Sequence, residues 1–99
     1  MSEQQKAKGE YEKALQVAQE KLSEVRKAAE EEYNKARVAI RAKYVKPGMS
    51  IPEDYEKEML AVQDEYYKIT MAAREEYDKA YQAAWEKYQK ALKSSSNMH

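Results

Sequence analysis

Residues 44–55 read YVKPGMSIPEDY, and this stretch decides the fold. It holds both prolines of the chain and one of its two glycines, the residues that most disfavour a helix interior, at ~3 and ~1 kcal/mol each. Ser50 with Glu53 makes a capping box, which predicts a new helix start. A second capping box, Ser2 with Gln5, stands near the beginning of the chain. The stretch therefore predicts a loop between two helices.

Outward from this loop, both arms carry an 11-residue repeat. Seven of the nine tyrosines lie at multiples of 11, and each is followed two residues later by lysine. The unit reads roughly Tyr-x-Lys-Ala-x-x-Ala-Ala-x-Glu-Glu, which resembles the hendecad pattern of long helical proteins. Eleven residues are close to three helical turns, at 3.67 residues per turn. The tyrosines at multiples of 11 are Tyr11, Tyr33, Tyr44, Tyr55, Tyr66, Tyr77 and Tyr88.

The tyrosine positions and the residues three, four and seven places later form one stripe, about 100° wide, as expected of a core-facing helix side. Leu, Ile and Val total only twelve residues, so tyrosine and alanine must supply most of this stripe. We expect a tyrosine of one helix to lie over alanines of the other. The regular repeat would fit an idealised, designed chain. Four residues count against that interpretation: the charged residues Arg26, Arg37 and Glu58, which depart from the apolar stripe, and Gly9.

The opposite side of each helix is predicted to be a solvated charged face. Acidic residues precede lysines by four positions, as in Glu31–Lys35 and Asp64–Lys68. That order favours ion pairs along a helix, worth ~0.3 kcal/mol each. Residues 1–48 hold 11 basic and 8 acidic side chains, and residues 49–99 hold 7 and 10. We therefore expect the two halves to attract each other.

These patterns predict an all-α fold, a long antiparallel helical hairpin of coiled-coil type. The helices are expected at about residues 3–45 and 51–93, with a loop at 46–50 and a flexible tail at 94–99. Residues 1–99 form a single domain in this interpretation. A lone hairpin would leave its stripe partly open, so we expect a homodimer that forms a four-helix bundle. The alternative is an opened chain, whose two helices pair along their whole length with another copy.

Composition excludes several classes of function. A net charge of zero argues against a nucleic-acid partner, and the absence of cysteine excludes a disulfide scaffold, a zinc finger and a thiol nucleophile. The only histidine is His99, so a di-iron bundle with Glu-x-x-His motifs is excluded, and no internal histidine can activate a serine. No calcium-loop spacing surrounds Glu30, Glu31 and Glu32, and no phosphate loop is present. We expect no enzyme activity, no cofactor and no metal.

A membrane surface is the alternative partner. The sequence shows no signal peptide and no run of ~20 apolar residues, so the expected location is the cytoplasm. The 11-residue period resembles that of synucleins and exchangeable apolipoproteins, whose motif residues do not match here. Binding to a lipid surface favours lysines that flank a strongly apolar stripe. Here the lysines lie opposite the stripe and next to acidic residues, so the sequence fits lipid binding poorly. Circular dichroism separates the two possibilities, because a bundle is helical without lipid and a membrane binder only with anionic vesicles.

One aromatic group widens the stripe near the C-terminal end. Four residues of this group are spaced by four, four and three positions, so they share one side of the second helix. They are Tyr77, Tyr81, Trp85 and Tyr88. Tyr67 widens the stripe nearer the start of the same helix. These five residues are either extra core and dimer contact or a hot spot for another protein, since Trp and Tyr dominate such patches. The sequence therefore predicts a non-enzymatic helical interaction or scaffold protein.

Overall fold

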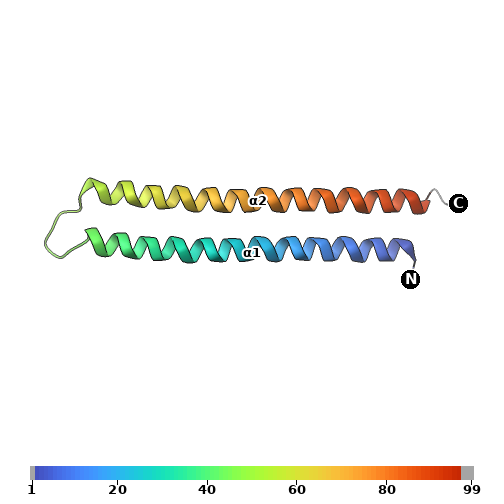
Figure 1. Ribbon diagram of the computed structural model, residues 1–99, viewed down its shortest axis with the longest axis horizontal. Coiled ribbons are helices and arrows are strands. Elements are labelled where there is room, and N and C mark those ends of the chain that lie inside the picture. The colour runs from blue at the N-terminus through green and yellow to red at the C-terminus, as the bar shows by residue number, and fades with distance from the viewer. Residues whose placement is uncertain (1, 97–99) are drawn as a thin grey trace. The chain divides into compact units, whose positions relative to one another are not determined.

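The structure is a computed structural model that describes residues 2–96. These residues form two helices, α1 (Glu3–Tyr44) and α2 (Glu53–Ser96), and the described range contains no strand (Figure 1). The predicted all-α class is confirmed. The last three residues of the predicted tail, which include His99, lie outside the described range.

The two helix starts differ in how they are capped. At the start of α1 the predicted box forms: the Gln5 backbone N–H donates to Ser2 Oγ at 3.2 Å, and the Ser2 N–H donates to Gln5 Oε1 at 3.4 Å. The predicted box of Ser50 with Glu53 is wrong, because α2 begins only at Glu53. There the carbonyl of Pro52 accepts the N–H of Tyr55 at 3.1 Å.

The loop is a turn that proline and glycine dictate together. The Met49 N–H donates to the Lys46 carbonyl at 3.2 Å, and Gly48 has a φ of +78°. Pro47 and Gly48 thus occupy the two central positions of a type II turn, which needs a positive φ at the second of them. The non-helical segment covers residues 45–52, slightly longer than the predicted 46–50.

α2 continues to Ser96, three residues beyond its predicted end. Serine costs only a few tenths of a kcal/mol relative to alanine in a helix, about what one further backbone hydrogen bond restores. The helix thus includes residues 94–96 of the predicted tail, whose flexibility stays a prediction.

The described residues fall into two units. The terminal unit contains the residues up to Ser23 and those from Arg74 onward, and the loop unit contains Glu24–Ala73. In each unit one segment of α1 lies beside one antiparallel segment of α2, and the loop unit is a helical hairpin (Figure 1). The single domain of residues 1–99 stays a prediction.

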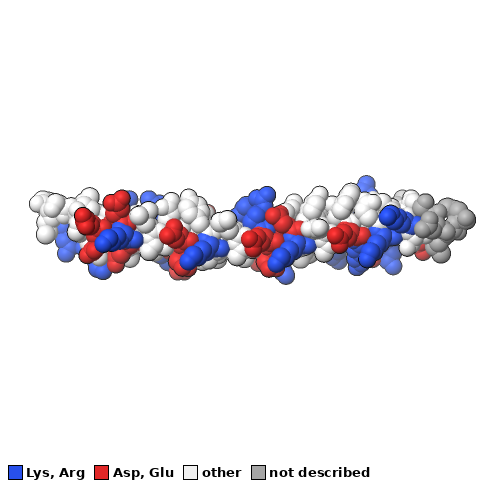
Figure 2. Space-filling view, turned by 90° about the horizontal axis from the view of Figure 1, so that it is seen from above, with Lys and Arg blue, Asp and Glu red and all other residues white. Residues whose placement is uncertain are grey.

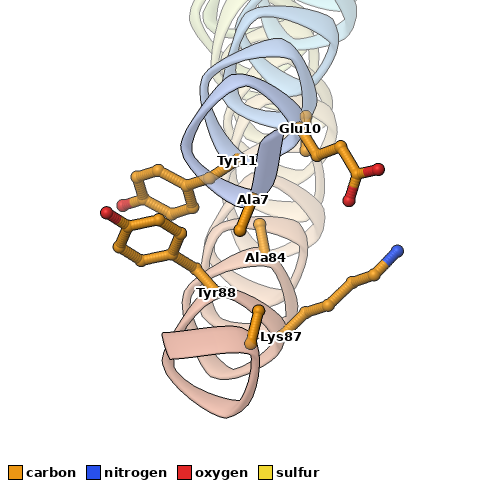
Figure 3. Close-up of a pocket in the computed structure, with 8 residues that line it drawn as sticks. Ala7, Glu10, Tyr11, Ala84, Lys87 and Tyr88 are labelled. Carbon is orange, nitrogen blue, oxygen red and sulfur yellow. The ribbon is translucent and has the colours of Figure 1, made fainter. Parts of the chain in front are cut away.

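The most buried residues of the two helices are alanines. Ala7 and Ala18 in the terminal unit and Ala29 in the loop unit are the described apolar residues with less than a tenth of their surface exposed, and no large side chain there is fully buried. Ala7 and Ala84 lie between the two helices (Figure 3). An alanine side chain loses no rotamer entropy on burial and lets two backbones approach closely. We call this line of contact the alanine seam.

The tyrosines flank the seam in pairs. Ring centroids are 5.0 Å apart for Tyr11–Tyr88, 4.9 Å for Tyr33–Tyr66 and 6.3 Å for Tyr44–Tyr55. The expected packing of tyrosine over alanine is therefore wrong: rings meet rings, and alanines meet alanines. The reason is the antiparallel register, which puts the tyrosine positions of both helices on the same side of the seam, as Figure 3 shows for Tyr11 and Tyr88.

The outer faces carry charges of both signs. Seen from the α2 side, acidic and basic side chains adjoin in groups along the surface (Figure 2). Lys35 contacts Glu32 at 3.9 Å rather than the expected Glu31, and Lys68 contacts Glu65 at 4.0 Å rather than Asp64. These four side chains are at least 70% exposed, so their ion pairs contribute little to stability.

Candidate interaction surface

An aromatic cluster is built in the terminal unit around Tyr11. The Tyr11 ring stacks on Tyr88 and meets Trp85 and Tyr81 edge-on, with centroid distances of 5.8 and 6.4 Å for the last two. Tyr77 extends the cluster through Tyr81 at 6.4 Å, and Trp85 lies 6.2 Å from Tyr88. Offset and edge-on geometries are those that aromatic pairs prefer. We call these five residues the aromatic cluster.

The sequence identified four of the five members but missed Tyr11. The spacing of four, four and three residues places the α2 members on one helix side, and the structure brings them together as expected. Tyr11 comes from α1, so no spacing within α2 can reveal it. The signal was its position: Tyr11 and Tyr88 are equally far along the chain from a point inside the loop, between Met49 and Ser50.

Two rings of the cluster remain open to solvent. Tyr81 is 43% exposed and Trp85 is 44% exposed, whereas Tyr11, Tyr77 and Tyr88 are half-buried. The half-buried rings hold the exposed ones in place through the contacts given above. Trp and Tyr that are exposed yet fixed in position are typical anchors of protein interfaces.

The tyrosine hydroxyls interact with one another. A hydrogen bond with Tyr81 is the main cause that raises the pKa of Tyr11 to about 12, with desolvation as a smaller cause. The Tyr11 phenol therefore stays neutral to higher pH than an ordinary tyrosine does.

On the other side of the seam, the terminal unit presents charge. Glu10 and Lys87 both extend away from Tyr11 and Tyr88, past Ala7 and Ala84 (Figure 3). The cavity that these residues line holds about 90 Å³, well below the ~300 Å³ at which ligand pockets begin. This side of the terminal unit is therefore a charged surface, and the small hollow does not have the size of a ligand pocket.

Tyr67, the fifth residue of the predicted binding site, belongs to the loop unit. Its ring lies 6.0 Å from that of Tyr66, its hydroxyl accepts a hydrogen bond from Gln63 Nε2 at 3.4 Å, and it is 51% exposed. Its interactions are thus with neighbours on α2, and it is not part of the aromatic cluster as defined.

The loop unit is held by charge as well as by rings. Lys43 Nζ lies 3.4 Å from Glu58 Oε1 across the two helices and 4.9 Å from the Tyr44 ring centroid. A hydrogen bond with Tyr44, and then Glu58, raises the pKa of Lys43. Glu58, which departs from the apolar stripe, is therefore explained by an interhelical ion pair.

Arg37 is a second departure from the stripe that the loop unit accommodates. Its guanidinium carbon lies 5.3 Å from the centroid of the Tyr33 ring, a cation–π contact. Its Nε is buried and has no hydrogen-bond partner among the described residues. The Arg37 side chain is thus half-buried against the Tyr33 ring.

The loop unit also contains two shallow apolar grooves, of about 330 and 440 Å³. Ala36, Ala61 and Val62 line both of them, and their only polar neighbours are glutamates and the Lys43–Glu58 pair. The part of the chain that the structure describes contains no group of three or more metal-ligating side chains. Within the same residues, neither helix has an apolar stretch of the length that crossing a membrane requires.

No protein-family model, no curated protein and no solved structure matches the chain.

Proposed function

We propose that this chain is a non-enzymatic helical interaction or scaffold protein, which acts through self-association and binding to other proteins. The observation that carries the proposal is the exposed pair Tyr81 and Trp85, held in place by the half-buried rings of the aromatic cluster. A cytoplasmic location belongs to the same proposal.

The gain from covering these rings is appreciable. A partner that buried both would remove on the order of 200 Å² of largely apolar surface, worth ~5 kcal/mol before the costs of association. The seam supplies little beyond alanine, since Ala7, Ala18 and Ala29 are the most buried apolar residues described. Each unit therefore has a strong physical reason to acquire a partner.

The simplest assembly is a homodimer in which two chains form a four-helix bundle. Such a bundle would cover ring edges and apolar side chains that two helices alone leave open. The large apolar side chains of the loop unit that are more than half exposed support this view. They are Val38, Met49, Ile51, Leu60, Tyr67 and Met71.

The test is the particle mass in solution, measured by sedimentation equilibrium. We expect about twice 11.6 kDa at micromolar concentration and a shift toward 11.6 kDa for Trp85→Ala. Gln82→Ala shortens an exposed polar side chain of α2 that belongs neither to the aromatic cluster nor to the exposed apolar residues, so it is the control. A wild-type chain that stays monomeric at high micromolar concentration, and that binds no protein through Trp85, would overturn the proposal.

A further inference from the structure

We propose that Tyr33 and Tyr66, which meet across the two helices of the loop unit, are a site of oxidative cross-linking. A one-electron oxidant removes a hydrogen atom from each phenol, and the two rings then join through a carbon–carbon bond. The product links α1 to α2 covalently in a chain that has no cysteine and so forms no disulfide. Such a link restricts the unfolded chain and thereby stabilises the hairpin. This inference does not depend on the function proposed above.

The distance between the two rings favours this bond. Their centroids lie 4.9 Å apart, and their planes are inclined by 36°. In a linked pair the rings are joined at the carbons next to the hydroxyl-bearing carbons, and the centroids are only slightly closer than they are here. Because the outer torsion of a tyrosine side chain has a broad energy minimum, a modest rotation of each ring brings these carbons together. The bond can therefore form without a rearrangement of the two helices.

The surroundings of the rings leave room for that rotation. Tyr33 and Tyr66 line the apolar groove of about 330 Å³, and three of its other lining residues are the alanines Ala29, Ala36 and Ala61. Both rings are half-buried. They are thus held beside each other, have space next to them and stay accessible to an oxidant from solvent.

The chemistry of the step balances with hydrogen peroxide as the oxidant. Loss of one electron and the phenolic proton turns each tyrosine into a phenoxyl radical, whose unpaired electron is shared with the ring carbons next to the C–O bond. Two such radicals form one carbon–carbon bond, and the hydrogen on each bonded carbon moves to the adjacent oxygen, which restores both phenols. A peroxidase consumes one peroxide for each pair and releases two waters, so the chain loses two hydrogen atoms.

The other interhelical ring pair of the loop unit is less suited to this reaction. The Tyr44 and Tyr55 rings lie 6.3 Å apart, and their planes are inclined by 79°. The edge of one ring points at the face of the other, so both the distance and the inclination must change before the carbons meet. We therefore expect little linkage between these two residues.

The terminal unit has a pair that is about as close but not isolated. The Tyr11 and Tyr88 centroids lie 5.0 Å apart, and Trp85 lies 5.8 Å from Tyr11 and 6.2 Å from Tyr88. An indole gives up an electron about as readily as a phenol does. Part of the radical therefore passes to Trp85, and fewer phenoxyl radicals remain to couple. We expect more linkage at Tyr33–Tyr66 than at this pair.

Mass spectrometry of the oxidised chain tests the site. The folded wild-type chain is treated with a peroxidase and hydrogen peroxide at low protein concentration and is then digested with trypsin. Trypsin cleaves after Lys and Arg, so Tyr33 is released in the peptide of residues 28–35 and Tyr66 in that of residues 58–68. We expect these two peptides to be joined, with a mass two hydrogen atoms below their sum, and dityrosine fluorescence to appear with them.

Two adjacent tyrosines supply the matched variants. Tyr66→Phe keeps the ring but has no phenolic hydrogen to lose, so the joined peptide should disappear. Tyr67→Phe changes a residue of the same tryptic peptide whose side chain is 51% exposed, and it should leave the joined peptide at the wild-type yield. Circular dichroism checks that both variants are as helical as the wild type.

Isotope labelling shows whether both halves of the joined peptide come from one chain. When labelled and unlabelled chains are mixed before oxidation, we expect the two halves of each joined peptide to carry the same label. A joined peptide with one labelled and one unlabelled half would mean that the rings meet between chains, and the inference would fail. It would also fail if the joined peptide were absent from the oxidised wild type, persisted in Tyr66→Phe or disappeared in Tyr67→Phe.

Discussion

The terminal unit and the loop unit join α1 to α2 through the same kind of alanine contact but differ in the side chains beside it. Beside the seam, the terminal unit has Tyr11 packed against three aromatic rings of α2. The loop unit has an interhelical ion pair, Lys43–Glu58, at 3.4 Å. One sequence repeat thus supports two kinds of surface, because the alanine and tyrosine positions make the contact and the positions beside them are free to vary.

The charge difference between the halves of the chain follows the same division. In the loop unit, residues 24–46 hold seven basic and four acidic side chains, and residues 53–73 hold two and six. In the terminal unit, residues 2–23 hold four of each, and residues 74–96 hold five basic and four acidic. The attraction expected from the whole sequence is therefore a property of the loop unit.

The largest effect is expected at the seam that both units share. Ala18→Leu in the terminal unit and Ala29→Leu in the loop unit should each lower the free energy of unfolding by about 1–3 kcal/mol, because a larger side chain forces the helices apart. Chemical denaturation measures both changes. Ala83→Leu, at an exposed position, is the control and should have little effect. A seam variant as stable as the wild type would contradict the shared alanine contact.

The next effect belongs to the terminal unit alone. The raised pKa of Tyr11, about 12 against an ordinary 10, favours the neutral phenol in the folded chain. Its stabilising contribution is therefore present below pH 10 and is lost as the pH rises through 12. Tyr81→Phe removes the hydroxyl partner and keeps the ring, so the late-ionising phenol should disappear from an absorbance titration of phenolate.

Tyr55→Phe, in the loop unit, is the matched control for that titration. Its ring meets Tyr44 at 6.3 Å, and the substitution should leave the late-ionising phenol unchanged. A phenol that still ionises near pH 12 in the Tyr81→Phe chain would mean that another contact raises the pKa of Tyr11.

The smallest effect is expected in the loop unit, where the ion pair is exposed. Salt at about 1 M shortens the Debye length to ~3 Å, so it should screen the attraction between the two oppositely charged segments. Amide hydrogen exchange should then speed up in residues 24–44 more than in residues 3–23. The Lys43→Glu, Glu58→Lys chain, with the pair reversed, should behave as the wild type does. Equal acceleration in both segments would remove the distinction between the units.

Much of the fold could be predicted from single-helix patterns. The proline–glycine stretch located the loop, the 11-residue period predicted the helices and their inner sides, and the spacing of Tyr77, Tyr81, Trp85 and Tyr88 predicted a common helix side. The predictions that failed concern neighbours across helices or at helix ends. The Ser50 cap, the end of α2 and the packing of tyrosine over alanine all depend on contacts that periodicity does not describe.

The sequence by itself determined that this chain forms two amphipathic helices around one turn, because helical periodicity and the backbone limits of proline and glycine act locally. Only the tertiary structure decided that Tyr11 completes the aromatic cluster, that Tyr81 raises its pKa, and that Glu58 has Lys43 as a partner. The 11-residue period of the sequence indicates which side chains share a face of one helix. Which side chains meet across two helices depends on their register and separation, and here the turn and the alanine seam set both.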